Sequence, residues 1–269
     1  MKSRIVIKCG GSTMDQLPPE FFQTIAQIQA KGAELIIVHG GGPAINARLK
    51  QLNIEPQFAD GLRVTCAQTI EVVEMVLAGT INKQLVRALL SAGASALGIS
   101  GMDGRMLVAR QTAQPIGLVG EIEQVNPEPI FHALSGGYIP VIAPLGLTAL
   151  ADQALNLNAD TAAGAIAARI RAEKLLMITD VPGILQVRNG EKQRLAHTNP
   201  IEIERMISTG EIHGGMIPKV RAACSALGQG VKEVVICQGT TADLLAAAAG
   251  NPVGTSITAE TPITGGAKR

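Results

Sequence analysis

Short apolar strands alternate with helical segments along nearly the whole chain, and this alternation restricts the fold more than any other feature. Residues 35–38 are a continuous apolar run, and residues 175–179 are apolar up to a final threonine, which is typical of strands buried on both faces. Segments with a helical apolar pattern, such as residues 19–31, lie between runs of this kind. Strands separated by helices predict the α/β class, with a mainly parallel sheet covered by helices on both faces.

One long helix is expected from Thr65 to Gly93. Thr65 and Gln68 have the spacing of a capping box at its start, and Gly79 marks a point where the helix could be interrupted. The pattern therefore predicts a long helix that either runs unbroken or bends near Gly79.

An alanine-rich helix is expected to end at Ala172, with Asn158 or Asp160 as its N-cap. Residues 106–111 and 119–125 have the pattern of an antiparallel pair outside the main sheet. No linker rich in Pro, Gly or Ser divides the chain. We therefore expect a single domain, residues 1–269, whose two lobes share one sheet.

Four turns rich in glycine follow predicted strands or precede predicted helices. A glycine turn lets backbone N–H groups approach an anion closely, and a helix that starts there adds its partial positive charge. One such turn would be explained by tight turning alone, but two of these four also carry a lysine, which favours an anion site. The turns are Lys8–Ser12, His39–Pro43, Asp180–Gly183 and His213–Lys219.

Several other classes of protein find little support. The sequence lacks GxxxxGK[ST], GxGxxG, HExxH and GxSxG, and it shows no cluster of metal ligands. The net charge of +1 and an aromatic content of 2% argue against nucleic-acid binding. No apolar run approaches the roughly 20 residues of a membrane span. Four scattered cysteines are typical of free thiols in a reducing compartment, so we expect a cytoplasmic protein.

Three charged residues are candidates for the chemistry. Lys8 ends the first strand beside a glycine turn, Lys219 lies at the start of a helix after another, and Asp160 begins the alanine-rich helix. Two lysines held by one aspartate would suit phosphoryl transfer, because that transition state needs cations and positioning. A carboxylate acceptor would need no general base, since it is ionised at pH 7.

Six stretches in order along the chain resemble the amino acid kinase family. The resemblance runs from Ile5 to about Ala259 and implies an open, three-layer αβα sandwich around a mainly parallel sheet. It also implies that residues 1–172 form a lobe that binds the acyl amino acid and residues 173–269 a lobe that binds ATP. The stretches are IVIKCGGS, IIVHGGGPAIN, DGLRVT, NLNADTAA, LLMITDVPGIL and GGMIPKV.

The resemblance also implies roles for single residues. Lys8 and Lys219 would stabilise the transferring phosphoryl group, and Asp160 would orient both. Arg63 would clamp a substrate carboxylate, for which lysine is a poor substitute. Backbone donors to the phosphate and the substrate would be Gly10, Gly11, Gly41 and Gly42.

Two asparagines and two further segments complete the expected site. Asn156 would contact the substrate and Asn158 would support the same site, although the residues alone favour helix capping. The nucleotide would be bound by Thr179, Asp180, Gly183, Ile184 and Leu185, together with Gly214, Gly215 and Met216.

The function implied by the resemblance is transfer of the γ-phosphate of ATP to the side-chain carboxylate of N-acetyl-L-glutamate, a step of arginine biosynthesis. Mg²⁺ would be held mainly by phosphates and water, because no pair of carboxylates is an obvious ligand. A homodimer insensitive to arginine is expected, since only three residues precede the first strand. The alternatives are a sibling kinase with an aminoadipate-type acceptor, a non-catalytic nucleotide-sensing protein and, with least support, a dehydrogenase.

Overall fold

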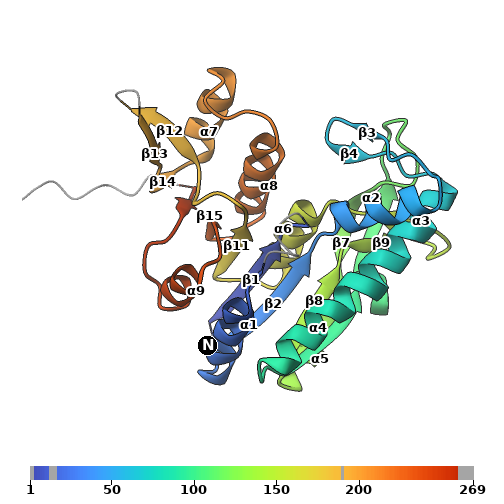
Figure 1. Cartoon of the computed structure of the whole chain (residues 1–269), viewed down its shortest axis with the longest axis horizontal. Helices are drawn as coiled ribbons and strands as arrows, with labels where there is room; N and C mark the ends of the chain where they lie inside the picture. Colours follow the sequence, from blue (N-terminus) through green and yellow to red (C-terminus); the bar gives the residue numbers. More distant parts are fainter. Residues whose placement is uncertain (1–2, 12–16, 189–190, 260–269) are drawn as a thin grey trace, which may run out of the picture.

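A large sheet forms the centre of the molecule (Figure 1). The computed structural model describes residues 3–11, 17–188 and 191–259, so Ser12 of the first glycine turn and residues 260–269 of the expected second lobe lie outside it. The described strands form an eight-stranded sheet in the order β14-β16-β15-β11-β1-β2-β8-β5. These strands are β1 (Arg4–Cys9), β2 (Glu34–His39), β5 (Ala96–Ser100), β8 (Ile139–Ala143), β11 (Lys174–Ile178), β14 (His197–Thr198), β15 (Glu233–Cys237) and β16 (Thr255–Ile257).

The predicted mainly parallel sheet is confirmed. Among the described strand pairs of this sheet, only β15 and β16 run antiparallel. Strand β1 lies between strands from both halves of the chain, with Cys9 in register with His39 of β2 and Ile178 of β11. The carboxyl ends of these three strands therefore meet at one edge, where ligands of such sheets bind.

Helices cover both faces of the sheet, which confirms the predicted three layers. In β1, Ile5 and Ile7 face one apolar cluster and Val6 the other, as expected for a strand whose side chains alternate. The first cluster includes side chains of α1 (Pro19–Ala30), α2 (Gly42–Gln51), α4 (Asn82–Ser91) and α9 (Thr241–Ala248). The second includes those of α5 (Glu128–Ser135), α6 (Ala159–Arg169), α7 (Pro200–Ser208) and α8 (Met216–Gly228).

The expected long helix is divided into three parts. Helix α3 (Ala67–Glu74) continues into the π-helix η2 (Met75–Ile81) and then into α4, so the interruption includes Gly79. The predicted capping box at Thr65 is wrong, because Cys66 is the N-cap and provides no side-chain cap. The Thr65 hydroxyl instead donates a hydrogen bond to the Arg63 carbonyl, at 2.8 Å.

Two predictions about smaller elements are resolved by the structure. Asn158, not Asp160, caps α6 by accepting hydrogen bonds from the backbone N–H groups of Asp160 and Thr161, and the helix ends at Arg169 rather than Ala172. The antiparallel excursion is confirmed as β6 and β7. It belongs to a four-stranded sheet of the described residues, made of β6 (Leu107–Gln111), β7 (Gly120–Val125), β9 (Leu145–Leu147) and β10 (Ala154–Asn156).

Two short hairpins and one 3₁₀ turn were not predicted. The hairpin of β3 and β4 projects over the carboxyl edge of the main sheet from the first half of the chain (Figure 1). None of the described helices has both the length and the apolar character needed to cross a bilayer. The additional elements are β3 (Phe58–Ala59), β4 (Leu62–Arg63), β12 (Leu185–Arg188), β13 (Glu191–Arg194) and η3 (Asp103–Arg105).

Candidate active site

Two lysines from opposite ends of the chain meet one aspartate. The Lys8 Nζ atom lies 2.7 Å from Asp160 Oδ1, and the Lys219 Nζ atom lies 3.7 Å from Asp160 Oδ2. Lys8 is in β1, Asp160 in the first turn of α6 and Lys219 in the first turn of α8. The structure thus brings together the three charged residues that the sequence singled out.

This cluster carries a net positive charge in a largely buried place. The side chains of Lys8 and Asp160 are 5% and 10% exposed, and that of Lys219 is 26% exposed. Burial, and next the positive charge of Lys8, lower the pKa of Lys219, while the Asp160 carboxylate raises it. Two ammonium groups share a single carboxylate, so Asp160 neutralises only part of their charge and an anion beside them would be attracted.

The first two glycine turns touch each other next to this cluster. A Cβ atom added to Gly11 would lie 2.7 Å from the backbone nitrogen of Gly41 and 2.8 Å from that of Gly42. A Cβ atom added to Gly41 would lie 2.5 Å from Ile81 Cδ1 and 2.6 Å from Leu77 Cδ2 of η2. A larger residue at Gly11 would clash with backbone, whereas one at Gly41 would have to displace the ends of two side chains, and two amide nitrogens lie side by side at the start of α2.

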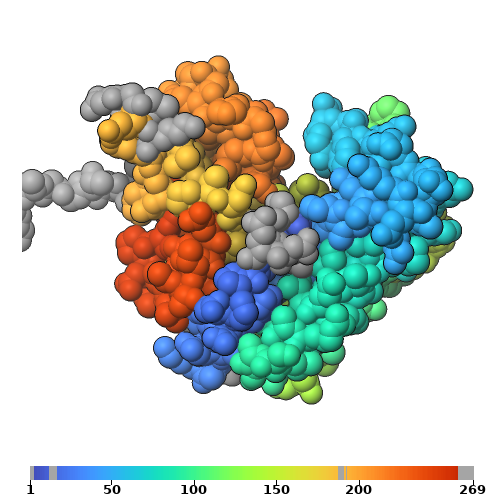
Figure 2. Space-filling view, viewed as in Figure 1, coloured from blue at the N-terminus to red at the C-terminus, as the bar shows by residue number. Residues whose placement is uncertain are grey.

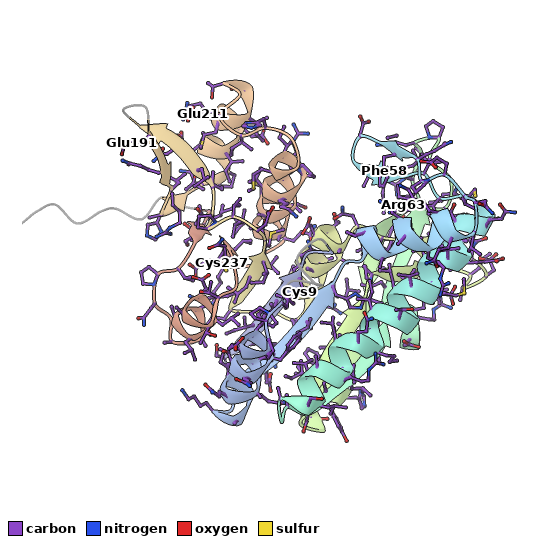
Figure 3. The ribbon with its side chains drawn as sticks, viewed as in Figure 1. Cys9, Phe58, Arg63, Glu191, Glu211 and Cys237 are labelled. Atoms are coloured by element: carbon purple, nitrogen blue, oxygen red, sulfur yellow. The ribbon has the colours of Figure 1, made fainter. Side chains whose placement is uncertain are left out.

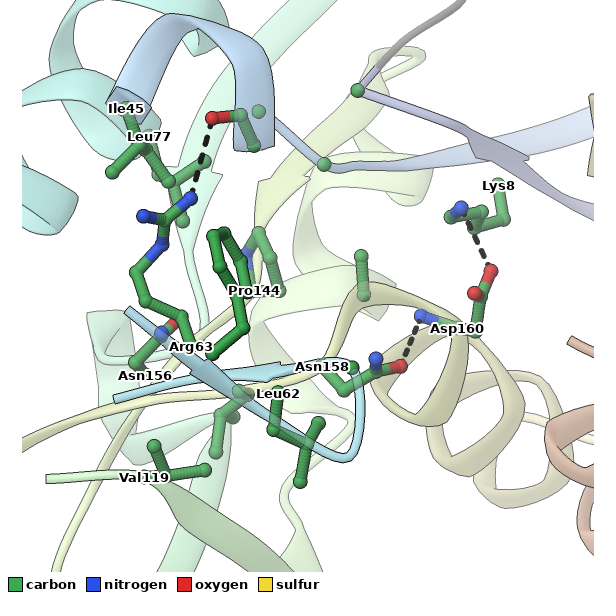
Figure 4. A pocket seen from close by; sticks show the side chains of 18 residues that line it. Lys8, Ile45, Leu62, Arg63, Leu77, Val119, Pro144, Asn156, Asn158 and Asp160 are labelled. Atoms are coloured by element: carbon green, nitrogen blue, oxygen red, sulfur yellow. Dashed lines mark hydrogen bonds and ion pairs between the residues drawn. The ribbon is translucent and has the colours of Figure 1, made fainter. Parts of the chain in front are cut away.

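A cavity of about 210 Å³ opens between the glycine turns and the β3–β4 hairpin (Figure 4). It has a charged side at Lys8 and Asp160, and a second polar side at Arg63. The residues expected in the site that line this cavity are Lys8, Gly11, Gly41, Gly42, Arg63, Asn156, Asn158 and Asp160.

Arg63 is held in the cavity wall with part of its guanidinium unpaired. Its Nη2 atom donates to Asn46 Oδ1 at 2.7 Å and to the Gly42 carbonyl at 3.3 Å, and its Cζ atom lies 4.8 Å from the centre of the Phe58 ring. Its Nη1 atom is buried and has no hydrogen-bond partner among the described residues. Burial also lowers the pKa of Arg63. A ligand carboxylate at Nη1 would satisfy a donor that otherwise costs roughly 1–3 kcal/mol.

The two asparagines differ in what they do. Asn156, at the end of β10, donates from Nδ2 to Thr65 Oγ1 at 3.1 Å and lines the cavity. Asn158 Oδ1 accepts from the Asp160 backbone nitrogen at 2.9 Å, so its side chain is used to start α6. Helix capping therefore describes Asn158 but not Asn156, and the cap places Asp160 in the first turn of its helix.

The segments expected to bind the nucleotide lie outside this cavity. The Thr179 backbone nitrogen donates to the Cys237 carbonyl at 2.9 Å, and its hydroxyl donates to Asp180 Oδ1 at 3.0 Å. Gly183 is tightly packed, since an added Cβ would lie 2.5 Å from Thr255 Oγ1. The backbone N–H of Ile184 donates to Thr255 Oγ1, and the next residue, Leu185, begins β12.

A hollow separates these segments from the cavity. Figure 2 shows it between the orange region around α8 and the light-blue region around β3 and β4. The groove there has a volume of about 460 Å³ and is lined by Asp60 and Leu62 on one side and by Pro218 and Arg221 on the other. On the α8 side, Gly214 and Gly215 lead into Met216, the first residue of the helix. Gly10 directly follows Cys9, the last residue of β1.

Sequence reasoning missed several residues of the site. Phe58 stacks on Arg63 (Figure 3), yet nothing in its surroundings in the sequence distinguishes it from a surface aromatic. Asn46, which binds Arg63, follows the glycine turn in the stretch quoted for the family, and this was the available signal. Leu77 and Ile81 contact Gly41 only because η2 sets their direction.

Known proteins resemble this chain over most of its length. The sequence model of the amino acid kinase family matches residues 3–238. An acetylglutamate kinase of Brevibacillus brevis is 56% identical over 258 residues, which are 96% of this chain and 97% of the relative. An acetylglutamate kinase of Geobacillus sp. is 47% identical over 245 residues, covering 90% of this chain and 92% of the relative.

Solved structures share the fold. The protein smu.665 from Streptococcus mutans UA159 is 32% identical, with a TM-score of 0.83 over 97% of this chain and 100% of that chain. Carbamate kinase from Giardia lamblia bound to AMP-PNP is 16% identical, with a TM-score of 0.69 over 96% of this chain and 99% of that chain, which shows the fold alone. The family match over most of the chain and the close relatives lead to one conclusion: this chain belongs to the amino acid kinase family.

Proposed function

We propose that this chain catalyses the ATP-dependent phosphorylation of the side-chain carboxylate of N-acetyl-L-glutamate, as a step of arginine biosynthesis. The observation that carries the proposal is the pairing of Asp160 with both Lys8 and Lys219 beside a cavity that Arg63 lines. The close relatives named acetylglutamate kinase supply the identity of the acceptor.

The cavity is proposed as the site of the acceptor. The unpaired Nη1 atom of Arg63 offers a donor to a carboxylate, and a guanidinium binds carboxylates through two parallel hydrogen bonds. Asn156 adds a side-chain amide in the same wall. The reacting carboxylate would then lie toward Lys8, at the other polar side of the cavity.

The reaction is a direct transfer. An oxygen of the acceptor carboxylate forms a bond to the γ-phosphorus while the bond from that phosphorus to the bridging oxygen breaks, and ADP leaves. Lys8 and Lys219 would stabilise the negative charge on the phosphoryl oxygens, and Asp160 would hold both in place. The backbone N–H groups of Gly41 and Gly42, which line the same cavity as Lys8, would be further donors.

The second half of the chain is proposed to bind ATP through the turns after β11 and before α8. Asp160 is engaged by two lysines, and the described residues contain no group of three or more His, Cys, Asp or Glu side chains suited to a metal. Mg²⁺ would therefore arrive with the phosphates of ATP and stay bound mainly to them and to water. When bound, it would neutralise part of the phosphate charge.

We also propose a cytoplasmic homodimer. Met75 and Leu90, on the long helical segment from α3 to α4, are 56% and 52% exposed, so this segment offers apolar side chains that a second subunit could cover. All four cysteines lie in the described part of the chain and are free, which fits a reducing compartment. Light scattering of the purified protein tests the dimer, and a monomeric mass would contradict it.

A hydroxamate assay tests the function. Hydroxylamine traps an acyl phosphate as a coloured hydroxamate, so N-acetyl-L-glutamate, free L-glutamate and L-2-aminoadipate can be compared side by side with ATP. We expect N-acetyl-L-glutamate to give the largest kcat/KM. A preference for aminoadipate would show that the proposed acceptor is wrong. If none of the three acceptors leads to ADP release, the nucleotide-sensing alternative would be favoured.

A further inference from the structure

His39 is a buried histidine to which the reaction described above gives no role. It ends β2, immediately before the turn Gly40–Gly42, and its residue surface is 0% exposed. A buried imidazole is costly unless its nitrogens are hydrogen-bonded. The partners of these two nitrogens therefore indicate what the side chain does.

Both ring nitrogens have partners, and together they define the proton position. The Nδ1 atom lies 3.0 Å from the Gly40 carbonyl oxygen, and the Nε2 atom lies 3.3 Å from Asn82 Nδ2. A carbonyl can only accept, so Nδ1 carries the proton and Nε2 accepts from the Asn82 amide. Burial lowers the pKa of His39 to about 4, with Lys83 as a smaller cause in the same direction, so the ring is neutral at pH 7.

Asn82 is itself fixed by the sheet. Its Nδ2 atom also lies 2.8 Å from the Val141 carbonyl of β8 and 3.2 Å from the Ile99 carbonyl of β5, and its Oδ1 atom accepts from Lys83 Nζ at 3.0 Å. A Cβ atom at Gly98 would lie 2.0 Å from Asn82 Oδ1, so that position leaves room only for glycine. The two N–H groups of this amide are shared among three acceptors, the two carbonyls and His39 Nε2, so the amide nitrogen faces the sheet and His39.

The bond from His39 to Gly40 has a consequence on the other side of the peptide. Peptide units are planar, and no cis peptide occurs among the described residues. The Gly40 carbonyl and the Gly41 N–H therefore point in opposite directions. Fixing the carbonyl toward His39 therefore also fixes the direction of the Gly41 N–H, whose nitrogen lies beside Gly11 and whose residue lines the cavity.

We propose that His39 is a positioning residue, which locks the Gly40–Gly41 peptide through its Nδ1–H so that the Gly41 N–H is held toward the transferring phosphoryl group. The inference rests on the proposed kinase activity. A preorganised donor works only if it need not reorient during the reaction, and loss of one such donor typically costs about 100- to 1,000-fold in kcat. If the donor is present but free to turn, kcat should fall by part of that factor, roughly 10- to 100-fold.

Two variants separate the two hydrogen bonds of the ring. The amide of His39→Asn reaches the position of Nδ1 and can still donate to Gly40, whereas that of His39→Gln reaches the position of Nε2 and keeps only the Asn82 contact. We expect His39→Gln to lower kcat by roughly 10- to 100-fold with KM for N-acetyl-L-glutamate changed less than about threefold, and His39→Asn to stay within about fivefold of wild type. The control is His132→Gln, because His132 is exposed on α5.

The folded fraction of each variant is measured by circular dichroism, and kcat is normalised to it. Wild-type kcat in folded His39→Gln, or equal losses in both His39 variants, would overturn the proposal. Nitrogen-15 NMR of the histidine-labelled wild-type protein tests the same geometry without a variant: we expect Nδ1 protonated and Nε2 unprotonated at pH 7, and the opposite tautomer would also overturn it. Inactivity of the wild type toward all three carboxylates would instead reject the proposed function, and the NMR result would still decide the geometry.

Discussion

The two sides of the candidate site are built differently. On the side of the first half of the chain, Arg63, Asn156 and the glycine turns close a cavity and are fixed by side-chain contacts. On the other side, Lys219 extends from α8 to Asp160 at 3.7 Å and is 26% exposed, against 2.7 Å and 5% for Lys8. The proposed acceptor side is therefore preformed, whereas the proposed nucleotide side reaches the reaction centre through one longer and more exposed contact.

Replacing the two lysines separately is the strongest way to test this comparison. Lys8→Met should lower kcat by about 100- to 1,000-fold, because a buried cation that acts on the transition state is worth about 3–4 kcal/mol. Lys219→Met should lower it less, by at least about tenfold, because solvent screens the more exposed charge. ADP release by the purified variants measures both effects. The exposed Lys50→Met is the control, and a Lys8→Met enzyme as fast as the control would contradict the assignment.

Arg63 tests the preformed side by itself. Arg63→Met should raise KM for N-acetyl-L-glutamate by roughly 10- to 100-fold, since a hydrogen bond to a charged group contributes about 1.5–3 kcal/mol. KM for ATP should stay near its wild-type value. Initial rates at varied concentrations of each substrate make the comparison, with the exposed Arg48→Met on α2 as control. A rise confined to KM for ATP would place Arg63 with the nucleotide instead.

One glycine on each side gives a matched pair. Gly41→Ala should destabilise the protein by about 1–3 kcal/mol, because the new methyl group would lie 2.5 Å from Ile81 and 2.6 Å from Leu77. Gly215→Ala should change the free energy of unfolding by less than about 0.5 kcal/mol, because an added Cβ there meets nothing within 4 Å. Urea denaturation measures both, and equal stabilities would show that the packing around Gly41 relaxes.

The last expected effect concerns pH and is read as a difference between two slopes. The pKa of His39 is about 4 in the folded chain, against an ordinary value of 6.5 for a histidine side chain in water. His39 in the unfolded chain therefore binds a proton below about pH 6.5, whereas His39 in the folded chain binds it only near pH 4. The free energy of unfolding falls as pH is lowered between these values, by at most about 1.4 kcal/mol per pH unit. Urea denaturation between pH 6.5 and 5 should show a shallower decline in His39→Asn than in wild type. Identical slopes would indicate that His39 is charged in the folded chain.

The central sheet could be predicted because its strands are apolar on both faces. Residues 35–38 and 175–178 have no polar side that could face water, so burial between helices was their expected place. The hairpins β3–β4 and β12–β13 have strands of two and four residues, too short for a period to be recognised. Their positions depend on packing rather than on local preference.

The candidate site could be predicted in part. Lys8, Asp160 and Lys219 were identified by their places next to strand ends and helix starts, and the family resemblance indicated that they would meet. The partnership of His39 with Asn82 was not visible, because the two residues are 43 positions apart and meet only after the sheet forms. The capping box failed for a related reason: the Thr65 hydroxyl binds the Arg63 carbonyl, a contact that the local sequence does not reveal.

The π-helix η2 has a consequence for how this chain tolerates changes in length. Each residue of an α-helix turns the next by about 100°, so the wider turns of Met75–Ile81 set the direction in which every later side chain of α4 points. Because its hydrogen bonds run from i to i+5, this stretch holds one residue more than regular α-helical winding would, so removal of one residue should restore that winding and leave Asn82 directed toward His39. Removal of a second residue would have no such reserve and would turn α4 by about 100°, which would take Asn82 away from His39 and leave the glycine turn without its support.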